Sequence, residues 1–390
     1  MALHRQILAG ERPPRYLIAV LPHYGLADQL VGVITLFYWA FLTGRAFQIS
    51  TGGQPLPPLE AAFDAPFVNW TRPAGDSPVL TQHLHLEYEG ERRYPATHPA
   101  VPNLSEYGSM RLINGFYDIL STENLSTIPE VEDNKSVLFM TSNRGCTQRI
   151  FNNPHYSQKL YDVGLRPETA FACAFRFLFA PSQVTRSAPG WQLAKSRLHP
   201  PSHANDSMTE GQDPSSKPEN VLRIGIQIRV GDRVYRSHTD DVQFEDYMPY
   251  FDCARTIERH KRTSETTKVV WYLVSDSQRL KEKALERFGP DLLVTSTQPN
   301  THVAHTQPKD LEEADKIMMG LGSAAADMLG LAENDYFVVT QNSGFGRIGA
   351  LLSGRWNHIW SLSSTSNERL LCRPADYVRL EDMASTWSGV

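Results

Sequence analysis

The stretch Ile224-Gly225-Ile226-Gln227-Ile228-Arg229-Val230-Gly231-Asp232-Arg233 decides the expected fold, because an alternating apolar strand in it ends at an arginine and a glycine. In an α/β protein the carboxyl ends of the strands open onto the ligand crevice. A planar guanidinium there can bind a phosphate through two parallel hydrogen bonds. We therefore interpret Arg229 as an anion-binding residue at a strand end, with a structural ion pair as the alternative.

A second element suited to phosphate follows about a hundred residues later in the chain. Residues 335–340 read as a buried strand, and the turn Gln341-Asn342-Ser343-Gly344-Phe345-Gly346 leads into a helix from Arg347 to Leu352. The free amides at the start of that helix would point at an anion. Each element alone is a weak indication, but the two in this order predict a phosphate-binding crevice.

Length and composition indicate a globular protein of two domains. The chain has 390 residues, of which 41% are hydrophobic and 21% are charged, and each half is long enough to bury its own core. The net charge of −5 and the lack of a basic run argue against nucleic-acid binding. Any anionic ligand must therefore be held by local groups.

Several features of the sequence indicate the cellular compartment of the protein. The four cysteines form no C-x-x-C pair, so neither zinc nor a redox motif is indicated, and one or two disulfides stay open. Met1 to Arg15 is too polar for a signal peptide, and the apolar run Leu30 to Leu42 is too short for a membrane helix, so we expect a buried core helix there and no signal or anchor in this chain. Asn-x-Ser/Thr sequons favour the secretory pathway, in the Golgi or ER lumen; they begin at Asn69, Asn103, Asn124, Asn134 and Asn205.

The order of apolar segments predicts two units in which strands and helices alternate. The first unit opens with a strand at 16–21, a turn at 22–27 and a helix that Gly44 ends. We expect an N-terminal Rossmann-like acceptor-side domain over 1–185, a linker or disordered insertion over 186–219 and a C-terminal nucleotide-binding domain over 220–390 whose last segment crosses back. Further elements are expected as strands at 136–141, 222–230, 269–274 and 335–340, and as helices at 154–164, 167–180, 245–262, 277–288, 309–329 and 345–353.

Four stretches resemble the GT-B fucosyltransferases, the superfamily of plant xyloglucan, core α1,6- and protein O-fucosyltransferases. The sequence 25–32 with 41–45 looks like the plant-type first βα unit, and 225–230 looks like its donor-phosphate strand. The sequence 272–276 is similar to the next strand of the core enzymes. Ser343-Gly344-Phe345-Gly346 is similar to the family's Ser-Thr-Phe-Gly turn. Plant-type signatures at 151–156 and 176–182 extend the likeness.

The resemblance implies roles for both phosphate elements. Arg229 would bind the β-phosphate of GDP-fucose and stabilise the leaving GDP, as its strand-end position already suggests. Ser343 would hold the same pyrophosphate with the amides of Gly344, Phe345 and Gly346. The chain departs from the family at Gly344, where the family has a hydroxyl, so one side-chain donor is lost.

Asp327 lies sixteen residues before Ser343 on the preceding helix. Resembling enzymes carry a carboxylate at this spacing that accepts hydrogen bonds from N1 and N2 of guanine. An ionised carboxylate only accepts hydrogen bonds, so it suits a base edge with two adjacent donors. Asp327 would thus determine the guanine preference; a solvated aspartate at a helix end is the alternative.

An inverting sugar transfer needs a base near the acceptor hydroxyl. The loop after Arg229 offers His238, Asp240 and Asp241 as candidates, although none stands out. In the first turn, Asp28 is either a helix N-cap or a ligand group, and Gly25 is needed chiefly by the backbone. The remaining expected donor-binding residues are Gln29, Gln227, Asp232, Asp276 and Asn342.

No metal site is expected. The chain contains no D-x-D, the metal–nucleotide anchor of the other large glycosyltransferase fold, and His83, His85 and Glu87 lack a fourth ligand. The expectation is an α/β GT-B fold of two Rossmann-like domains facing a central crevice. The expected function is inverting transfer of fucose from GDP-fucose, without cofactor, to a glycan or protein hydroxyl. Use of another GDP-sugar, or a silent GDP-sugar- or glycan-binding protein, is the alternative.

Overall fold

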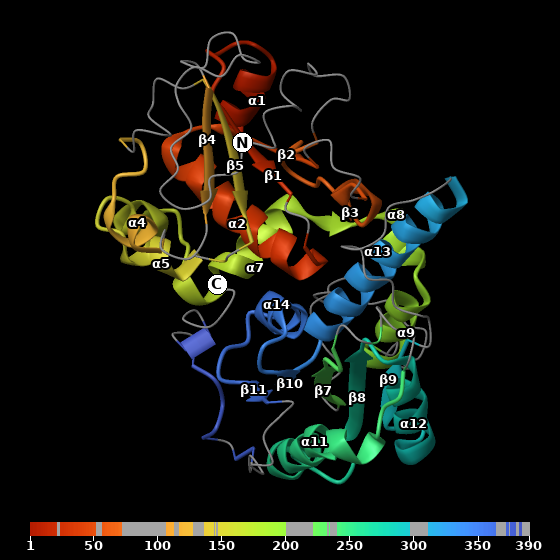
Figure 1. Cartoon of the computed structure of the whole chain (residues 1–390). Helices are drawn as coiled ribbons and strands as arrows, with labels where there is room; N and C mark the ends of the chain where they lie inside the picture. The colour runs from red at the N-terminus through yellow and green to blue at the C-terminus, as the bar shows by residue number, and fades with distance from the viewer. Residues whose placement is uncertain are drawn as a thin grey trace, which may run out of the picture. The chain divides into compact units, whose positions relative to one another are not determined.

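Two αβ units make up the part of the chain that the computed structural model describes (Figure 1). The first comprises Met1–Ser182, Val303–Met318 and Leu380–Val390, and the second Gln183–His302 and Met319–Arg379. The described residues are 1–21, 24–51, 57–71, 107–112, 117–127, 136–143, 145, 147–199, 221–231, 234, 240–296, 311–363, 372–373, 375–379 and 382–383.

The first unit is built on a parallel sheet in the order β2-β1-β5-β4. Its apolar strand β1 pairs with β2 on one side and with β5 on the other, so the chain's first strand lies inside the sheet. The strands are β1 (Tyr16–Val20), β2 (Ala46–Ser50), β4 (Tyr107–Leu112) and β5 (Val137–Ser142), with β3 (Phe63–Asp64) and β6 (Ala180–Pro181) paired apart from them. The helices are α1 (Ala2–Leu8), η1 (Leu59–Ala61), α4 (Tyr117–Thr122), α5 (Thr147–Asn152), α6 (Ser157–Asp162) and α7 (Pro167–Leu178).

Helix α2 (Leu26–Thr43) is the core helix of this unit. It packs on β1, β2 and β5, and it ends at Gly44, whose φ of 66° lies in the left-handed region that suits glycine. Gly32 approaches β5 so closely that an added Cβ would lie 1.8 Å from the Ser142 carbonyl oxygen. Among the described helices, α2 is the one long and apolar enough to cross a membrane, but 83% of it is buried. The expected buried core helix is therefore confirmed.

The second unit contains a five-stranded parallel sheet in the order β11-β10-β7-β8-β9. The first of these strands in the chain lies at the centre, the next two follow on one side, and the last two lie on the other, which is the order of a Rossmann sheet. The strands are β7 (Val221–Ile228), β8 (Lys268–Ser275), β9 (Leu293–Thr295), β10 (Tyr336–Thr340) and β11 (Ile359–Leu362). The helices are α8 (Gln183–Ser187), α9 (Pro189–Leu198), η4 (Phe244–Tyr247), α11 (Met248–Lys261), α12 (Gln278–Phe288), α14 (Gly344–Leu352) and, from Met319 onward, α13 (Leu311–Ala332).

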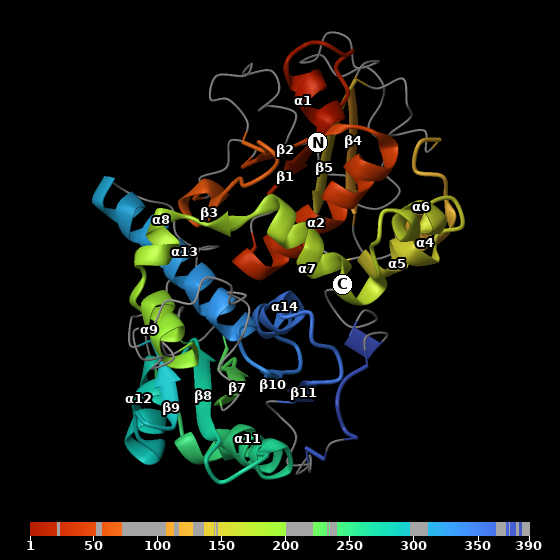
Figure 2. The same ribbon diagram turned by 180° about the vertical axis from the view of Figure 1, so that it is seen from behind.

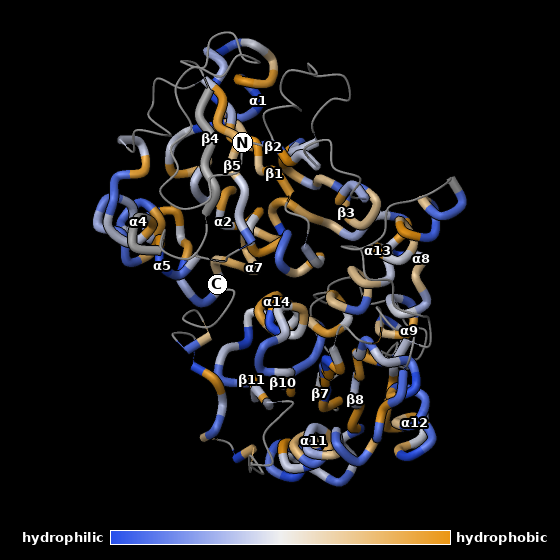
Figure 3. The backbone as a smooth tube through the Cα atoms, viewed as in Figure 1, coloured by the Kyte–Doolittle hydropathy of each residue, from blue (hydrophilic) through white to orange (hydrophobic). Residues whose placement is uncertain are grey.

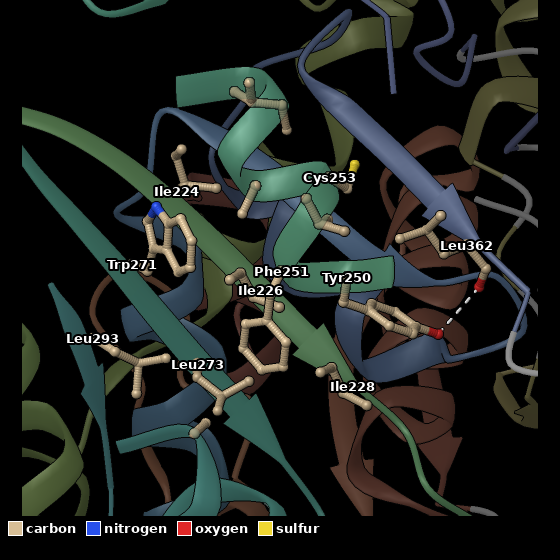
Figure 4. Packing of buried hydrophobic residues seen from close by; sticks show 14 of the residues in the cluster. Ile224, Ile226, Ile228, Tyr250, Phe251, Cys253, Trp271, Leu273, Leu293 and Leu362 are labelled. Atoms are coloured by element: carbon tan, nitrogen blue, oxygen red, sulfur yellow. Dashed lines mark hydrogen bonds between the residues drawn. The ribbon is translucent and has the colours of Figure 1, made fainter. Parts of the chain in front are cut away.

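One face of this sheet is covered by α11 and α12. Alternate residues of β7, Ile224, Ile226 and Ile228, pack against Phe251 of α11 and against Trp271 and other residues of the buried cluster (Figure 4). In Figure 3 the strands β7 and β8 are largely hydrophobic, whereas α12 is largely hydrophilic. The alternation along β7 therefore reflects one large apolar core on this face.

The other face carries α9, α13 and α14. An added Cβ at Gly225 of β7 would lie 2.7 Å from Leu331 of α13, and one at Gly349 of α14 would lie 2.6 Å from the same leucine. Seen from behind in Figure 2, α9 lies beside β8 and β9, which it contacts. Helices on both faces make this a doubly wound sheet.

The expected linker over 186–219 is wrong in its first part, because α8 and α9 occupy 183–187 and 189–198. Pro189 begins α9, where its missing N–H costs nothing. Ala194 and Leu198 are buried, and the Arg223 Nε donates a hydrogen bond to the Leu198 carbonyl at 2.7 Å. Tertiary contacts thus hold a helix whose proline- and serine-rich surroundings suggested a linker. Residues 200–219 lie outside the described part.

One disulfide is present in the second unit. It joins Cys253 of α11 to Cys372 across 119 residues of chain, and Cys173 is free and exposed in the first unit. Cys146 lies outside the described residues. One of the two disulfides that the sequence left open is therefore formed.

Candidate nucleotide-diphosphate site

The candidate site lies at the carboxyl edge of the second sheet, between β7 and β10. The strand order reverses between these two neighbours, which is where ligands of open α/β sheets bind. Arg229 directly follows β7, and the turn 341–343 directly follows β10 and precedes α14. The sheet therefore brings together two phosphate-binding elements that the sequence separates.

Arg229 is held at this edge through its backbone and its side chain. Its N–H donates to the Thr340 Oγ1 at 2.9 Å, and its Nη1 lies 3.3 Å from the Asp276 Oδ2. The Arg229 side chain is 31% exposed, whereas that of Asp276 is 4% exposed. The Arg229 guanidinium is thus accessible to a ligand, and the buried Asp276 carboxylate orients it through the ion pair.

Asp276 also holds the loop that follows β7. Its carboxylate accepts hydrogen bonds from the N–H of Val230 at 2.7 Å and of Gly231 at 3.1 Å. Burial raises the pKa of Asp276, and the nearby Arg229 charge and these N–H groups oppose that rise. Asp276, expected to bind the donor, acts in this structure as the support of Arg229.

Thr340, at the end of β10, connects the two strands. Its hydroxyl contacts the Gln227 carbonyl at 3.3 Å and the Tyr250 hydroxyl at 3.0 Å, and its N–H donates to the Gln227 Oε1 at 3.3 Å. An added Cβ at Gly346 would lie 2.3 Å from that same Oε1. Gln227, also expected to bind the donor, is buried and supports the turn, and Gly346 is needed to leave room for it.

The turn after β10 ends in a capped helix. Ser343 is the N-cap of α14, and its hydroxyl accepts a weak hydrogen bond from the Gly346 N–H at 3.5 Å. Asn342 is exposed, and Gly344 and Phe345 are half-buried. The first amides of α14 and the positive end of its dipole therefore lie where the sequence predicts an anion.

Asp327 lies on α13 beneath the start of α9. It is 4% exposed, and its Oδ1 has no hydrogen-bond partner among the described residues. Burial raises the pKa of Asp327 to about 6, and the nearby Lys281 opposes the rise. An added Cβ at Gly190 of α9 would lie 2.7 Å from this Oδ1. Asp327 is thus a buried acceptor with spare capacity rather than the solvated aspartate of the alternative.

Other unpaired polar groups lie in the same part of the unit. The hydroxyls of Tyr272 and Thr295 are buried and have no hydrogen-bond partner in the described structure. An added Cβ at Gly330, one helical turn after Asp327, would lie 2.4 Å from the Tyr272 hydroxyl. Unsatisfied buried donors and acceptors are costly, so their clustering favours a bound polar group.

The two described candidate bases, Asp240 and Asp241, contact residues at the start of α12. The Asp240 carboxylate accepts hydrogen bonds from the Ser277 hydroxyl at 2.5 Å and the Arg279 N–H at 2.8 Å, at the start of α12. Asp241 is 80% exposed and forms a surface ion pair with Arg279 at 3.7 Å. Asp240 thus supports the start of α12 in this structure, and its role as a base stays a prediction. His238 and Asp232 lie outside the described residues.

The first turn of the first unit differs in detail from the expectation. Gly25 is the N-cap of α2, and Asp28 is the third helical residue rather than the N-cap. The Gln29 Nε2 donates to the Tyr24 carbonyl at 3.1 Å, which closes the turn. Asp28 therefore stabilises the helix start through its charge. Among the described residues, no three His, Cys, Asp or Glu side chains form a metal-binding group, and His83, His85 and Glu87 are outside that set.

The fold is an α/β fold of two units, each built on a parallel sheet, and the edge formed by β7 and β10 has the features of an anion-binding site. No protein-family model matches the chain, and a sequence comparison with curated proteins found no match. Among solved structures, a mutant of FUT1 from Arabidopsis thaliana in complex with GDP matches with a TM-score of 0.60. This match has 16% sequence identity and covers 94% of this chain and 76% of that one. The fucosyltransferase NodZ from Bradyrhizobium matches with a TM-score of 0.45 at 16% identity, over 87% of this chain and 94% of that one. The match to FUT1 shows that this chain has the GT-B fold of that structure.

Proposed function

We propose that the protein is an inverting, metal-independent glycosyltransferase that transfers fucose from GDP-fucose to a hydroxyl of a glycan or a protein. The observation that carries the proposal is the joining of Arg229 and the Ser343 turn at one strand edge through Thr340. The FUT1 structure with the same fold contains GDP. A donor with a diphosphate leaving group fits an edge that carries an accessible guanidinium and a free helix start.

In this mechanism the second unit stabilises the departing diphosphate. Arg229 forms a forked contact with the β-phosphate as negative charge develops there, and Asp276 holds the fork in place. The amides of Gly344, Phe345 and Gly346 bind the same diphosphate. Asp327 accepts the two N–H groups of guanine, which requires its ionised form.

Metal independence has a direct test. The chain lacks D-x-D, and its arginine and helix amides would neutralise the diphosphate without a divalent ion. Fucose transfer should therefore survive an excess of EDTA. Loss of activity on chelation, with recovery on adding manganese or magnesium, would contradict the proposal.

A silent GDP-sugar-binding protein is the second candidate, because Asp240 serves as a helix cap and Gly344 has no side chain. Calorimetry with GDP beside a turnover assay with GDP-fucose separates the two. Binding with GDP release supports the enzyme, and binding without release supports the silent protein. A donor hydrolysis screen over GDP-sugars tests whether fucose is the sugar transferred.

The secretory pathway is the proposed location. The Cys253–Cys372 disulfide is typical of an oxidising compartment, and the sequons agree with it. A mass shift of the cell-expressed protein on treatment with an N-glycosidase would support this location, and a reduced Cys253 in the isolated protein would contradict it.

A further inference from the structure

Arg347 of α14 is a buried arginine that none of the roles above uses. Arg347 is 4% exposed, and its Nη2 donates a hydrogen bond to the Gln341 carbonyl. Its Nη1 is buried and has no hydrogen-bond partner among the described residues. Burial lowers the pKa of Arg347, and no described carboxylate lies close enough to oppose that effect.

An unpaired buried cation is unusual, because removing a charge from water is costly unless an anion accompanies it. Arg223 shows the ordinary arrangement in the same unit. It is 2% exposed, and its Nη1 lies 3.3 Å from the Asp335 carboxylate. Arg347 therefore has the burial of a paired arginine without the anion that such an arginine normally has.

The position of Arg347 indicates where the anion would bind. Gln341, which accepts its hydrogen bond, follows Thr340, and Thr340 accepts the Arg229 N–H. Because both terminal nitrogens belong to one planar guanidinium, Nη1 also lies close to this turn. The second arginine is thus held at the same strand edge as the first, through the residue that follows β10.

The charge of the edge also calls for a second cation. Arg229 is paired with the buried Asp276 at 3.3 Å, so much of its charge is already compensated. A diphosphate carries more than one negative charge at neutral pH. The start of α14 supplies about half a positive charge. Arg229 and the helix alone would leave a bound diphosphate undercompensated.

We propose that Arg347 is a second diphosphate-binding arginine, whose free Nη1 contacts the phosphates while its Nη2 fixes the Gln341 carbonyl. The inference rests on the proposed function, because the diphosphate belongs to the same donor. Arg347 supplies the side-chain donor that is lost at Gly344. The expected ligand chemistry is a nucleoside diphosphate, with inorganic pyrophosphate as its minimal form.

The test is calorimetry of the full chain with GDP, inorganic pyrophosphate and guanosine. Arg347→Gln should weaken the binding of GDP and of pyrophosphate by about 10- to 100-fold, because a charged hydrogen bond is removed. Guanosine binding should not change, since guanosine has no phosphate. Arg347→Lys should lose less affinity than the glutamine variant. Arg355→Gln is the matched control, because Arg355 is paired with Asp335 at 3.0 Å elsewhere in the unit.

Each outcome decides the inference. Unchanged GDP and pyrophosphate affinity in a folded Arg347→Gln protein overturns it, and so does an equal loss of guanosine affinity, which indicates a structural role. If Arg347→Gln does not fold, the affinities of Arg347→Lys for GDP, pyrophosphate and guanosine are compared in the same way and decide the inference. Pyrophosphate binding that depends on Arg347 in a protein that does not bind GDP leaves the inference standing and removes the proposed function. A wild-type protein that binds neither compound overturns both.

Discussion

Arg229 combines two demands that oppose each other at the level of the single residue. Under the proposed function its guanidinium must stay accessible to a ligand, yet it must be fixed well enough to present both N–H groups. The Asp276 pair and the backbone bond to Thr340 provide that fixing from the buried side. A lysine could keep the charge but has no planar fork, so geometry rather than charge is the property at stake.

Arg229→Lys should therefore lower turnover with GDP-fucose by about 100-fold or more. The thermal unfolding temperature should change little, because the ion pair with Asp276 persists. Arg355→Lys, elsewhere in the same unit, should leave turnover unchanged. Near-normal activity of the Arg229 variant in a steady-state assay would exclude Arg229 from the site.

Under the proposed function, Asp327 predicts a pH dependence of GDP binding with a defined sign. Its pKa is raised to about 6, so the carboxylate is ionised above that pH and protonated below it. Guanine needs the ionised form, so GDP affinity should fall as the pH is lowered from 7.5 to 5. Asp327→Asn should bind GDP more weakly at pH 7.5 and should lose that fall. Calorimetry over this pH range checks both, and a wild-type affinity that is flat across pH 6 would refute the assignment.

These residues differ in how well the sequence alone predicts their positions in the structure. Arg229 directly follows an apolar strand and Ser343 follows another after two residues, so their place at a strand edge could be predicted. Thr340 is the last residue of its strand, and its bond to Arg229 exists only because β10 and β7 are neighbours. Arg347 reads as an ordinary helical arginine until its burial is known.

At the scale of elements, long apolar segments were predicted well and short edge segments were missed. The expected strands at 222–230 and 335–340 correspond to β7 and β10, and the helix ended by Gly44 corresponds to α2. The edge strands β2, β4, β9 and β11 were not predicted. Of these, β9 and β11 have only three and four residues, which is too few to show alternation. The helix expected at 154–164 is shorter, since α6 covers 157–162.

Helix α9 shows how tertiary contacts override composition. Its far end is bound by Glu333, which accepts hydrogen bonds from His199 at 2.9 Å and Lys195 at 3.4 Å. Its start lies against Asp327 through Gly190. A helix with little apolar surface of its own is thus positioned over the buried acceptor.

Gly190→Ala should disturb both stability and binding, because the new Cβ would lie 2.7 Å from Asp327 and 3.3 Å from Ser296. We expect the free energy of unfolding to fall by about 1 to 3 kcal/mol, with weaker GDP binding. Denaturant unfolding and calorimetry measure the two effects. Ser196→Ala, exposed on the same helix, is the control. A variant as stable as the wild type would mean that α9 does not rest on Asp327.

For the whole molecule, the Cys253–Cys372 disulfide is the one covalent cross-link among the described residues. It closes a loop of 119 residues that contains β8, β9, α13 and β10. Replacing both Cys253 and Cys372 by alanine should lower the free energy of unfolding of the second unit by about 4 to 5 kcal/mol, through the entropy of the unfolded chain. Cys173→Ala, a free cysteine in the first unit, is the control. Equal unfolding curves with and without a reductant would contradict this expectation.

The strand order of the second sheet also determines when its strands can pair during synthesis. Arg229 and Thr340 are 111 residues apart, and β8 and β9 are synthesised between them although they lie on the far side of β7. During translation, one edge of β7 therefore remains unpaired until β10 has been synthesised and has paired with it. Such an edge invites pairing with other chains. The appearance of GDP binding in a nascent chain should mark the moment when that edge closes, and the nucleotide would then favour the completed sheet over every earlier intermediate.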